Sequence, residues 1–184
     1  AERVLDAVVA ANAANAEEAL AAPAEGKTVG EVITDESAIM GERIVLRKVS
    51  SVEAPATAVY LHRTSKDLPP QIGVVVGYEG DDAKTALSIA QHISFADPLY
   101  VTRDEVPAAD VEKEREIVTE ISKNEGKPEA ALPKIVEGRL NAFFKQVVLN
   151  EQVHALDDEK RDVKKVAEAA GITVTSFARS KVGA

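Results

Sequence analysis

Cysteine is absent from the sequence, and its absence removes several kinds of chemistry at once. Without a thiol, the chain cannot form a disulfide, bind a metal through thiolate ligands or use a cysteine nucleophile. Tryptophan is also absent and aromatic residues make up only 4% of the chain, so apolar burial must come mainly from Val, Ile, Leu and Ala. This composition favours closely packed helices and small sheets.

Positive charge is scarcer than negative charge, and the formal net charge is -9 at pH 7. Binding to a phosphate backbone requires a basic surface that displaces counterions, so we expect no direct nucleic-acid partner. Long apolar runs are missing as well, since no stretch reaches the roughly eighteen residues that a spanning helix needs. The chain also has no basic and then apolar start, and we expect neither a membrane partner nor a targeting segment.

The 184 residues contain 45% hydrophobic residues, which is enough for a core in one domain or two small ones. The most regular stretch, 110–150, reads as two amphipathic helices on either side of a turn at 126–128, because apolar residues recur on both arms at three- and four-residue steps. Gly126 is typical of a helix C-terminus and Pro128 of the first turn of a helix. The stretch therefore predicts a projecting helical hairpin.

The N-terminal part reads as two amphipathic helices, over 1–15 and 28–39, followed by a single strand over 44–51. No capping residue precedes the first helix. A lone strand cannot satisfy its own backbone groups and needs partner strands. We therefore expect the chain to be a fragment that begins inside a structural repeat.

The rest of the chain alternates between strand and helix patterns. Two strands, over 58–63 and 72–78, are expected to form an antiparallel hairpin, and a helix with Asp81 as its N-cap and its end at Asp97-Pro98 has a broad apolar face that can cover it. A helix over 162–170 then leads into a last strand over 173–182. The expected fold class is α+β.

Phosphate-binding and metal-binding motifs are incomplete. Glu25-Gly26-Lys27-Thr28 resembles the end of a phosphate-binding loop, but that motif requires glycine where Ala21 stands. The three histidines, His62, His92 and His154, lie far apart, and none is spaced from another as metal ligands are. We expect no metal and no cofactor.

A catalytic dyad is conceivable only around His154, with Asp157 or Asp158 as its partner. No activated nucleophile stands beside these residues, and a loop followed by a helix cap explains them equally well. We expect no catalytic site. An acidic surface and a projecting hairpin favour instead a protein that binds another protein.

Several segments, taken in order, resemble bacterial translation elongation factor Ts, and the resemblance covers essentially the whole chain. The Gly-Lys-Pro and Ile-Val-Glu-Gly-Arg stretches are the most specific of them. The segments are Ile72-Gly73-Val74-Val75-Val76, Ile89-Ala90-Gln91-His92, Glu125-Gly126-Lys127-Pro128, Ile135-Val136-Glu137-Gly138-Arg139-Leu140 and Val174-Thr175-Ser176-Phe177-Ala178-Arg179-Ser180-Lys181-Val182-Gly183.

The resemblance implies a cytoplasmic guanine-nucleotide exchange factor that promotes GDP release from the GTPase elongation factor Tu and has no active site of its own. It implies two subdomains with small antiparallel sheets covered by helices: 1–55 as the remainder of the first, and 56–100 with 150–184 as the second. Residues 101–149 are an inserted coiled-coil hairpin. Partner contacts are implied at His62 and at Ala155 and Leu156.

The family also has an N-terminal helical domain and a Thr-Asp-Phe-Val stretch, which lies ahead of the helix equivalent to 1–13 and pushes into the partner's nucleotide domain. Neither occurs in this sequence. We therefore expect a truncated factor with impaired exchange. The alternative hypothesis is a structural module that self-associates into a homodimer, through the hairpin or through the exposed edge of the 44–51 strand, without exchange activity.

Overall fold

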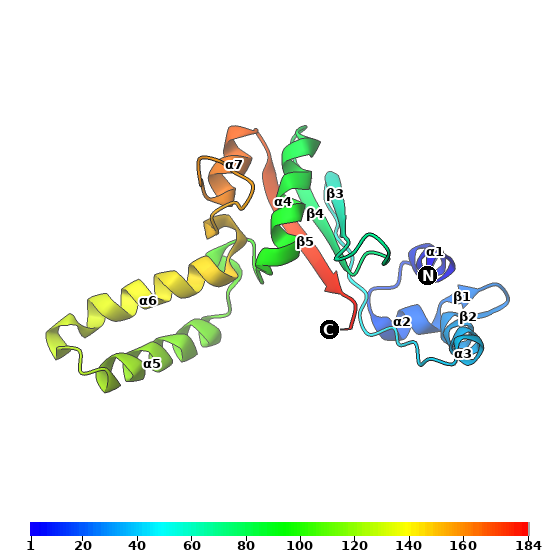
Figure 1. The fold of residues 1–184 in the computed structure, drawn as a ribbon, viewed down its shortest axis with the longest axis horizontal. Coiled ribbons are helices and arrows are strands. Elements are labelled where there is room, and N and C mark those ends of the chain that lie inside the picture. The colour runs from blue at the N-terminus through cyan, green and yellow to red at the C-terminus, as the bar shows by residue number, and fades with distance from the viewer. Residues whose placement is uncertain (184) are drawn as a thin grey trace. The chain divides into compact units, whose positions relative to one another are not determined.

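The structure, a computed structural model, describes residues 1–183. The chain forms two compact units, Ala1–Ser51 and Val52–Ala184. Helices combine with small antiparallel sheets, one of two strands and one of three (Figure 1). The α+β prediction is confirmed.

The first unit is mainly helical. Its elements are α1 (Glu2–Ala10), α2 (Ala16–Ala21), β1 (Pro23–Ala24), β2 (Lys27–Thr28) and α3 (Val29–Met40). Helix α3 begins with a capping box, in which the backbone N–H of Glu31 donates to the Thr28 hydroxyl at 3.2 Å and the Glu31 carboxylate accepts from the Thr28 N–H at 2.7 Å. The small core is built from alanine and valine, as the composition predicts.

The strand predicted over 44–51 is wrong. Residues 43–54 form neither helix nor strand, and within residues 1–183 no strand pairs with them. The apolar residues of this segment are used differently, since Leu46 and Val49 pack against the core of the first unit. The alternating pattern is typical of a strand with one buried and one exposed face. A strand also needs backbone hydrogen bonds to a neighbouring strand, and this segment has no such neighbour within residues 1–183.

The second unit is built around a three-stranded sheet in the order β3-β4-β5, with both pairings antiparallel. Helix α4 packs on the sheet, and their shared core includes Val74, Val76, Ile89 and Ile93, each with no exposed surface. The predicted strands and covering helix are therefore confirmed. Their bounds are β3 (Ala56–His62), β4 (Ile72–Glu79), α4 (Ala83–Ala96) and β5 (Thr173–Lys181).

The predicted N-cap of α4, Asp81, is wrong by one residue. The N-cap is Asp82, whose carboxylate accepts from the backbone N–H of Thr85 at 3.0 Å. Gly80, in the turn between β4 and α4, has a φ of +103°, and the helix starts three residues later at Ala83. The helix ends as predicted at Asp97, which is left-handed with a φ of 49°.

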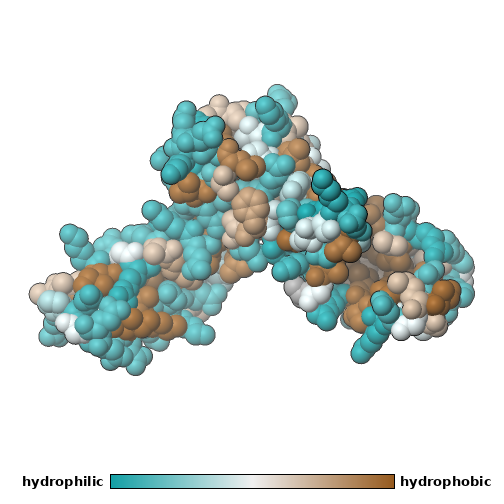
Figure 2. Space-filling model, in the orientation of Figure 1, coloured by the Kyte–Doolittle hydropathy of each residue, from teal (hydrophilic) through white to brown (hydrophobic). Residues whose placement is uncertain are grey.

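Helices α5 (Ala108–Asn124) and α6 (Leu132–Val147) run side by side and are joined by a turn (Figure 1). We call them the helical pair. They contact each other through Val118, Val136 and Leu140. Gly126, with a φ of 72°, follows the end of α5 as expected, but Pro128 precedes a 3-10 turn (Glu129–Ala131) and does not start α6. Figure 2 shows hydrophobic residues scattered among hydrophilic ones on the pair.

Short 3-10 turns at Arg103–Glu105 and Leu149–Glu151 flank the helical pair in the sequence. The Arg103 guanidinium forms an ion pair with Glu151 and lies 4.3 Å from the ring centre of Phe144, so it fastens the end of α6 to both turns. Helix α7 (Val163–Ala169) then leads into β5, as predicted. No helix within residues 1–183 is long and apolar enough to cross a membrane.

Candidate partner-binding site

Ala155 and Leu156 lie in a loop whose two ends are joined by backbone hydrogen bonds. Val153 and Asp162 form an antiparallel bridge, and the N–H of His154 donates to the carbonyl of Arg161 at 2.9 Å. We call residues 153–162 the closed loop. Leu156 keeps 54% of its surface exposed at the outer side of this loop. This exposed leucine side chain is apolar surface that a partner protein could bury.

Arg161 forms ion pairs with two acidic residues of the closed loop, Asp157 at 2.6 Å and Glu159 at 3.3 Å. The Asp157 carboxylate accepts from the backbone N–H of Arg161 at 2.8 Å and from its guanidinium at 2.6 Å. These hydrogen bonds favour the charged carboxylate, the side-chain bond most strongly, and they bring the pKa of Asp157 to about 2. The loop therefore has a defined shape at neutral pH.

Replacing Arg161 with glutamine is expected to raise the pKa of Asp157 from about 2 toward its ordinary value of 3.8, because the largest cause of the lowering is removed. A lowered carboxyl pKa stabilises the folded loop fully above 3.8, and this contribution is lost as the pH falls toward 2. An NMR titration of the Asp157 carboxyl carbon measures the change. Lys160→Gln, which removes an unpaired charge of the same loop, is the control and should leave that pKa near 2. An equal pKa in both variants would contradict the assignment.

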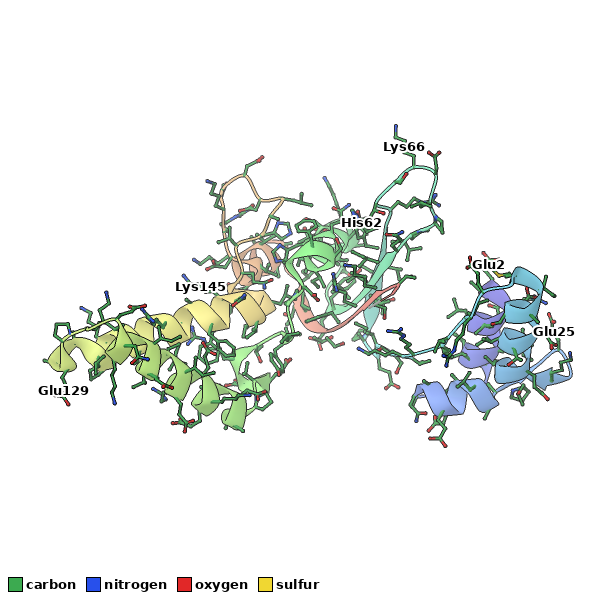
Figure 3. All side chains as sticks on the ribbon, turned by 60° about the horizontal axis from the view of Figure 1, so that its bottom comes forward. Glu2, Glu25, His62, Lys66, Glu129 and Lys145 are labelled. Carbon is green, nitrogen blue, oxygen red and sulfur yellow. The ribbon has the colours of Figure 1, made fainter. Side chains whose placement is uncertain are left out.

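His62 ends strand β3 at one edge of the sheet and is half-buried. Its Nδ1 atom lies 3.1 Å from the hydroxyl of Tyr60, two residues earlier. In Figures 1 and 3, β3 and the closed loop lie on opposite sides of α4. Ala155 and Leu156 therefore lie together in the closed loop, whereas His62 lies elsewhere, at the edge of the sheet.

His92 and His154 are far apart in the sequence, but the fold brings them together. His92 on α4 and His154 in the closed loop stack with ring centres 5.4 Å apart, and each is only 2% exposed. Sequence reasoning missed this pair because its members come from distant segments. The one available indication was that the polar residues Ser88 and His92 are four positions apart and so lie on the same face of the helix.

The structure does not pair His154 with Asp157. The Nε2 atom of His154 lies 3.1 Å from the Ser88 hydroxyl, and its Nδ1 atom accepts from the Leu156 N–H at 3.2 Å. Both nitrogens are thus occupied, while the Asp157 carboxylate is paired with Arg161. Within residues 1–183, no group of three or more His, Asp or Glu side chains is arranged to hold a metal ion.

Comparison with known proteins decides the family. The family model described as "Elongation factor TS" matches residues 1–184, the whole of the chain. The chain belongs to the elongation factor Ts family. The resemblance seen in the Gly-Lys-Pro and Ile-Val-Glu-Gly-Arg stretches is therefore confirmed.

Curated proteins of the elongation factor Ts family are similar along the full chain. The elongation factor Ts of Clavibacter michiganensis subsp. michiganensis is 66% identical over 183 residues, which are 100% of this chain and 66% of that protein. The elongation factor Ts of Leifsonia xyli subsp. xyli is 62% identical, with the same shares covered. That of Saccharopolyspora erythraea is 50% identical, over 67% of its length. The chain thus spans about two thirds of the length of these relatives.

Proposed function

We propose that this chain acts in protein synthesis as part of a guanine-nucleotide exchange factor that binds elongation factor Tu and promotes release of its GDP. The observation that carries the proposal is membership of the elongation factor Ts family over residues 1–184. Exchange of this kind needs no catalytic side chain. A factor that binds the nucleotide-free partner more tightly than the GDP-bound one lowers GDP affinity by the same factor, by thermodynamic linkage. We also propose that the protein is located in the cytoplasm, where protein synthesis takes place.

The closed loop supports one of the proposed contacts. Leu156 and Ala155 are exposed, and the leucine adds apolar area where a partner can bury it. His62 is the second proposed contact, at the sheet edge. We further propose the division into a first subdomain at 1–55, a second at 56–100 with 150–184, and a coiled-coil insertion at 101–149.

Fluorescent GDP bound to elongation factor Tu tests the proposal. We expect the 184 residues by themselves to bind the GTPase and to speed GDP dissociation only weakly, because the printed sequence contains no Thr-Asp-Phe-Val stretch. Dissociation as fast as with a full-length relative would contradict the expected weak exchange. Absence of any binding would contradict the proposed partner.

Leu156→Ala is expected to weaken binding to elongation factor Tu by about tenfold, because it removes apolar surface at the proposed contact. His62→Ala should weaken binding several-fold. Titration calorimetry measures both affinities. Leu99→Ala is the matched control, since Leu99 is 63% exposed and belongs to neither proposed contact. If Leu156→Ala binds as tightly as Leu99→Ala, the loop is not a contact.

The alternative function, self-association without exchange, draws on one observation. Ile117 and Ile121, one turn apart on α5, remain 42% and 43% exposed after α6 has packed. If they join two copies, light scattering over a concentration series will show a mass that doubles for the chain and stays constant for a variant lacking residues 107–147. A constant mass for both would count against self-association.

A further inference from the structure

The buried histidine pair touches the exposed turn of the closed loop directly. His92 comes from α4, which packs on the sheet, and His154 comes from the loop itself. Their rings stack with an interplanar angle of 18°. The rings accept hydrogen bonds from the backbone N–H groups of Ala155 and Leu156, and α4 packs in the core of the second unit. The pair therefore connects a rigid element to the proposed partner contact.

The hydrogen bonds of His92 determine which of its nitrogens carries the proton. Its Nδ1 atom accepts from the backbone N–H of Ala155 at 3.2 Å, and because a backbone N–H can only donate, Nδ1 must be unprotonated. Nε2 then carries the proton and donates it to the side-chain oxygen of Gln152 at 2.9 Å. The amide nitrogen of Gln152 donates to the carbonyl of Gln146 at 2.7 Å, which keeps the oxygen turned toward His92.

His154 repeats the same arrangement. Its Nδ1 atom accepts from the backbone N–H of Leu156 at 3.2 Å, so its Nε2–H donates to the hydroxyl of Ser88 at 3.1 Å. The successive backbone N–H groups of Ala155 and Leu156 thus donate to the Nδ1 atoms of two stacked imidazole rings. Both rings are neutral, and both use the same tautomer.

The surroundings favour these neutral rings. Burial lowers the pKa of His92 below its ordinary value of 6.5, and the neighbouring ring of His154 lowers it further, against the raising effect of Gln152. Burial also lowers the pKa of His154, against the raising effects of a hydrogen bond at Ser88 and of the Asp157 charge, and Arg161 lowers it further. These two charged groups come from the closed loop, whereas α4 contributes only the uncharged Ser88.

We propose that His92 and His154 are positioning residues that, as neutral imidazoles, hold the Ala155–Leu156 turn in the conformation that presents Leu156 to a partner protein. The inference rests on the proposed function for the identity of that partner. Protonation of either ring places a proton on Nδ1, where it meets a backbone N–H, so that one hydrogen bond of the turn is lost. The partner contact therefore depends on pH.

The direction of this pH dependence follows from the lowered pKa values. When the turn opens, the histidines regain their ordinary pKa of 6.5 and bind protons that the closed turn excludes. The closed turn is therefore fully stable above pH 6.5 and loses stability as the pH falls below it. For one histidine the loss is at most about tenfold per pH unit in that range.

Nitrogen NMR of the unmodified chain, without any partner, tests the first step. Long-range nitrogen–proton spectra at about pH 7.5 are expected to show Nε2–H tautomers for both His92 and His154. An Nδ1–H tautomer or an imidazolium ion at either ring would overturn the proposal. Because no residue is changed, this result does not depend on a variant folding correctly.

Hydrogen exchange tests the second step. The protection factors of the Ala155 and Leu156 amides should fall by roughly several-fold or more between pH 7.5 and about pH 5.5. The double variant His92→Asn and His154→Asn keeps an acceptor near each Nδ1 position but cannot titrate, so its protection should be independent of pH. His62→Asn is the control and should retain the pH dependence. Constant protection in the unmodified chain, or an unchanged pH dependence in the double variant, would overturn the proposal.

Affinity for elongation factor Tu separates this inference from the proposed function. The unmodified chain should bind about tenfold more weakly at about pH 5.5 than at pH 7.5, whereas Leu156→Ala should show only the pH dependence that the partner itself contributes. Equal pH dependence of both would overturn the positioning role. Failure of the unmodified chain to bind at any pH would contradict the proposed function, while the two NMR measurements would still decide whether the histidines hold the turn.

Discussion

Replacing Ile89 with alanine is expected to lower the free energy of unfolding of the second unit by about 2–5 kcal/mol, the usual range for an isoleucine removed from a core. Ile89 has no exposed surface and packs in the core shared by α4 and the sheet. The change removes apolar contacts and leaves a cavity that the surrounding strands cannot close. Urea unfolding followed by circular dichroism measures the loss.

Leu87→Ala provides the control for this substitution. Leu87 lies two residues earlier on the same helix and keeps 39% of its surface exposed, so it loses less burial and leaves no enclosed cavity. We expect a cost of no more than about 1 kcal/mol. If both alanine variants unfold at the same urea concentration, α4 does not cover the sheet in the way that the structure shows.

Replacing Gly80 with alanine is expected to destabilise the second unit by about 2–4 kcal/mol. Gly80 has a φ of +103°, which a residue with a side chain rarely adopts. A Cβ atom at this position would also lie 2.5 Å from the carbonyl oxygen of Gly171, and this oxygen belongs to the backbone and cannot move aside cheaply. The turn between β4 and α4 would therefore have to shift. Thermal unfolding measures the effect.

Gly138→Ala is the matched control and should act in the opposite direction. Gly138 lies inside α6, and no atom lies within 4 Å of a Cβ placed on it. Alanine is the better helix former, so we expect the stability to rise by about 0.5–1 kcal/mol. Destabilisation by Gly138→Ala comparable to that by Gly80→Ala would show that the effect is not specific to the turn.

Local patterns predicted the elements of the second unit because each has its periodicity within a short stretch. The β-branched run over 72–78 became β4, and the three- and four-residue spacing of Ala86, Ile89, Ala90 and Ile93 became the buried face of α4. Boundaries were less predictable. The predicted N-cap of α4 was Asp81, whereas the observed N-cap is the next residue, Asp82.

The segment 44–51 shows where a local pattern fails. Its alternation of apolar and polar residues is typical of a strand, but a strand also needs hydrogen-bonding partners that lie elsewhere in the chain. Such partners are a property of the fold and not of the segment. In the structure its residues Leu46 and Val49 contribute packing alone.

The amino-acid sequence alone determined the family, the α+β class and most of the helices and strands, because these depend on short motifs and on periodicity. Only the tertiary structure decided that the Leu156 side chain is exposed in a turn whose backbone is hydrogen-bonded to buried histidines. The Ser88 hydroxyl and the His154 ring that it meets are 66 positions apart, and a side chain's spacing in the sequence does not reveal which distant group it will face. Folding placed two buried histidines under an exposed turn, and burial lowers the pKa of both below the ordinary value of 6.5.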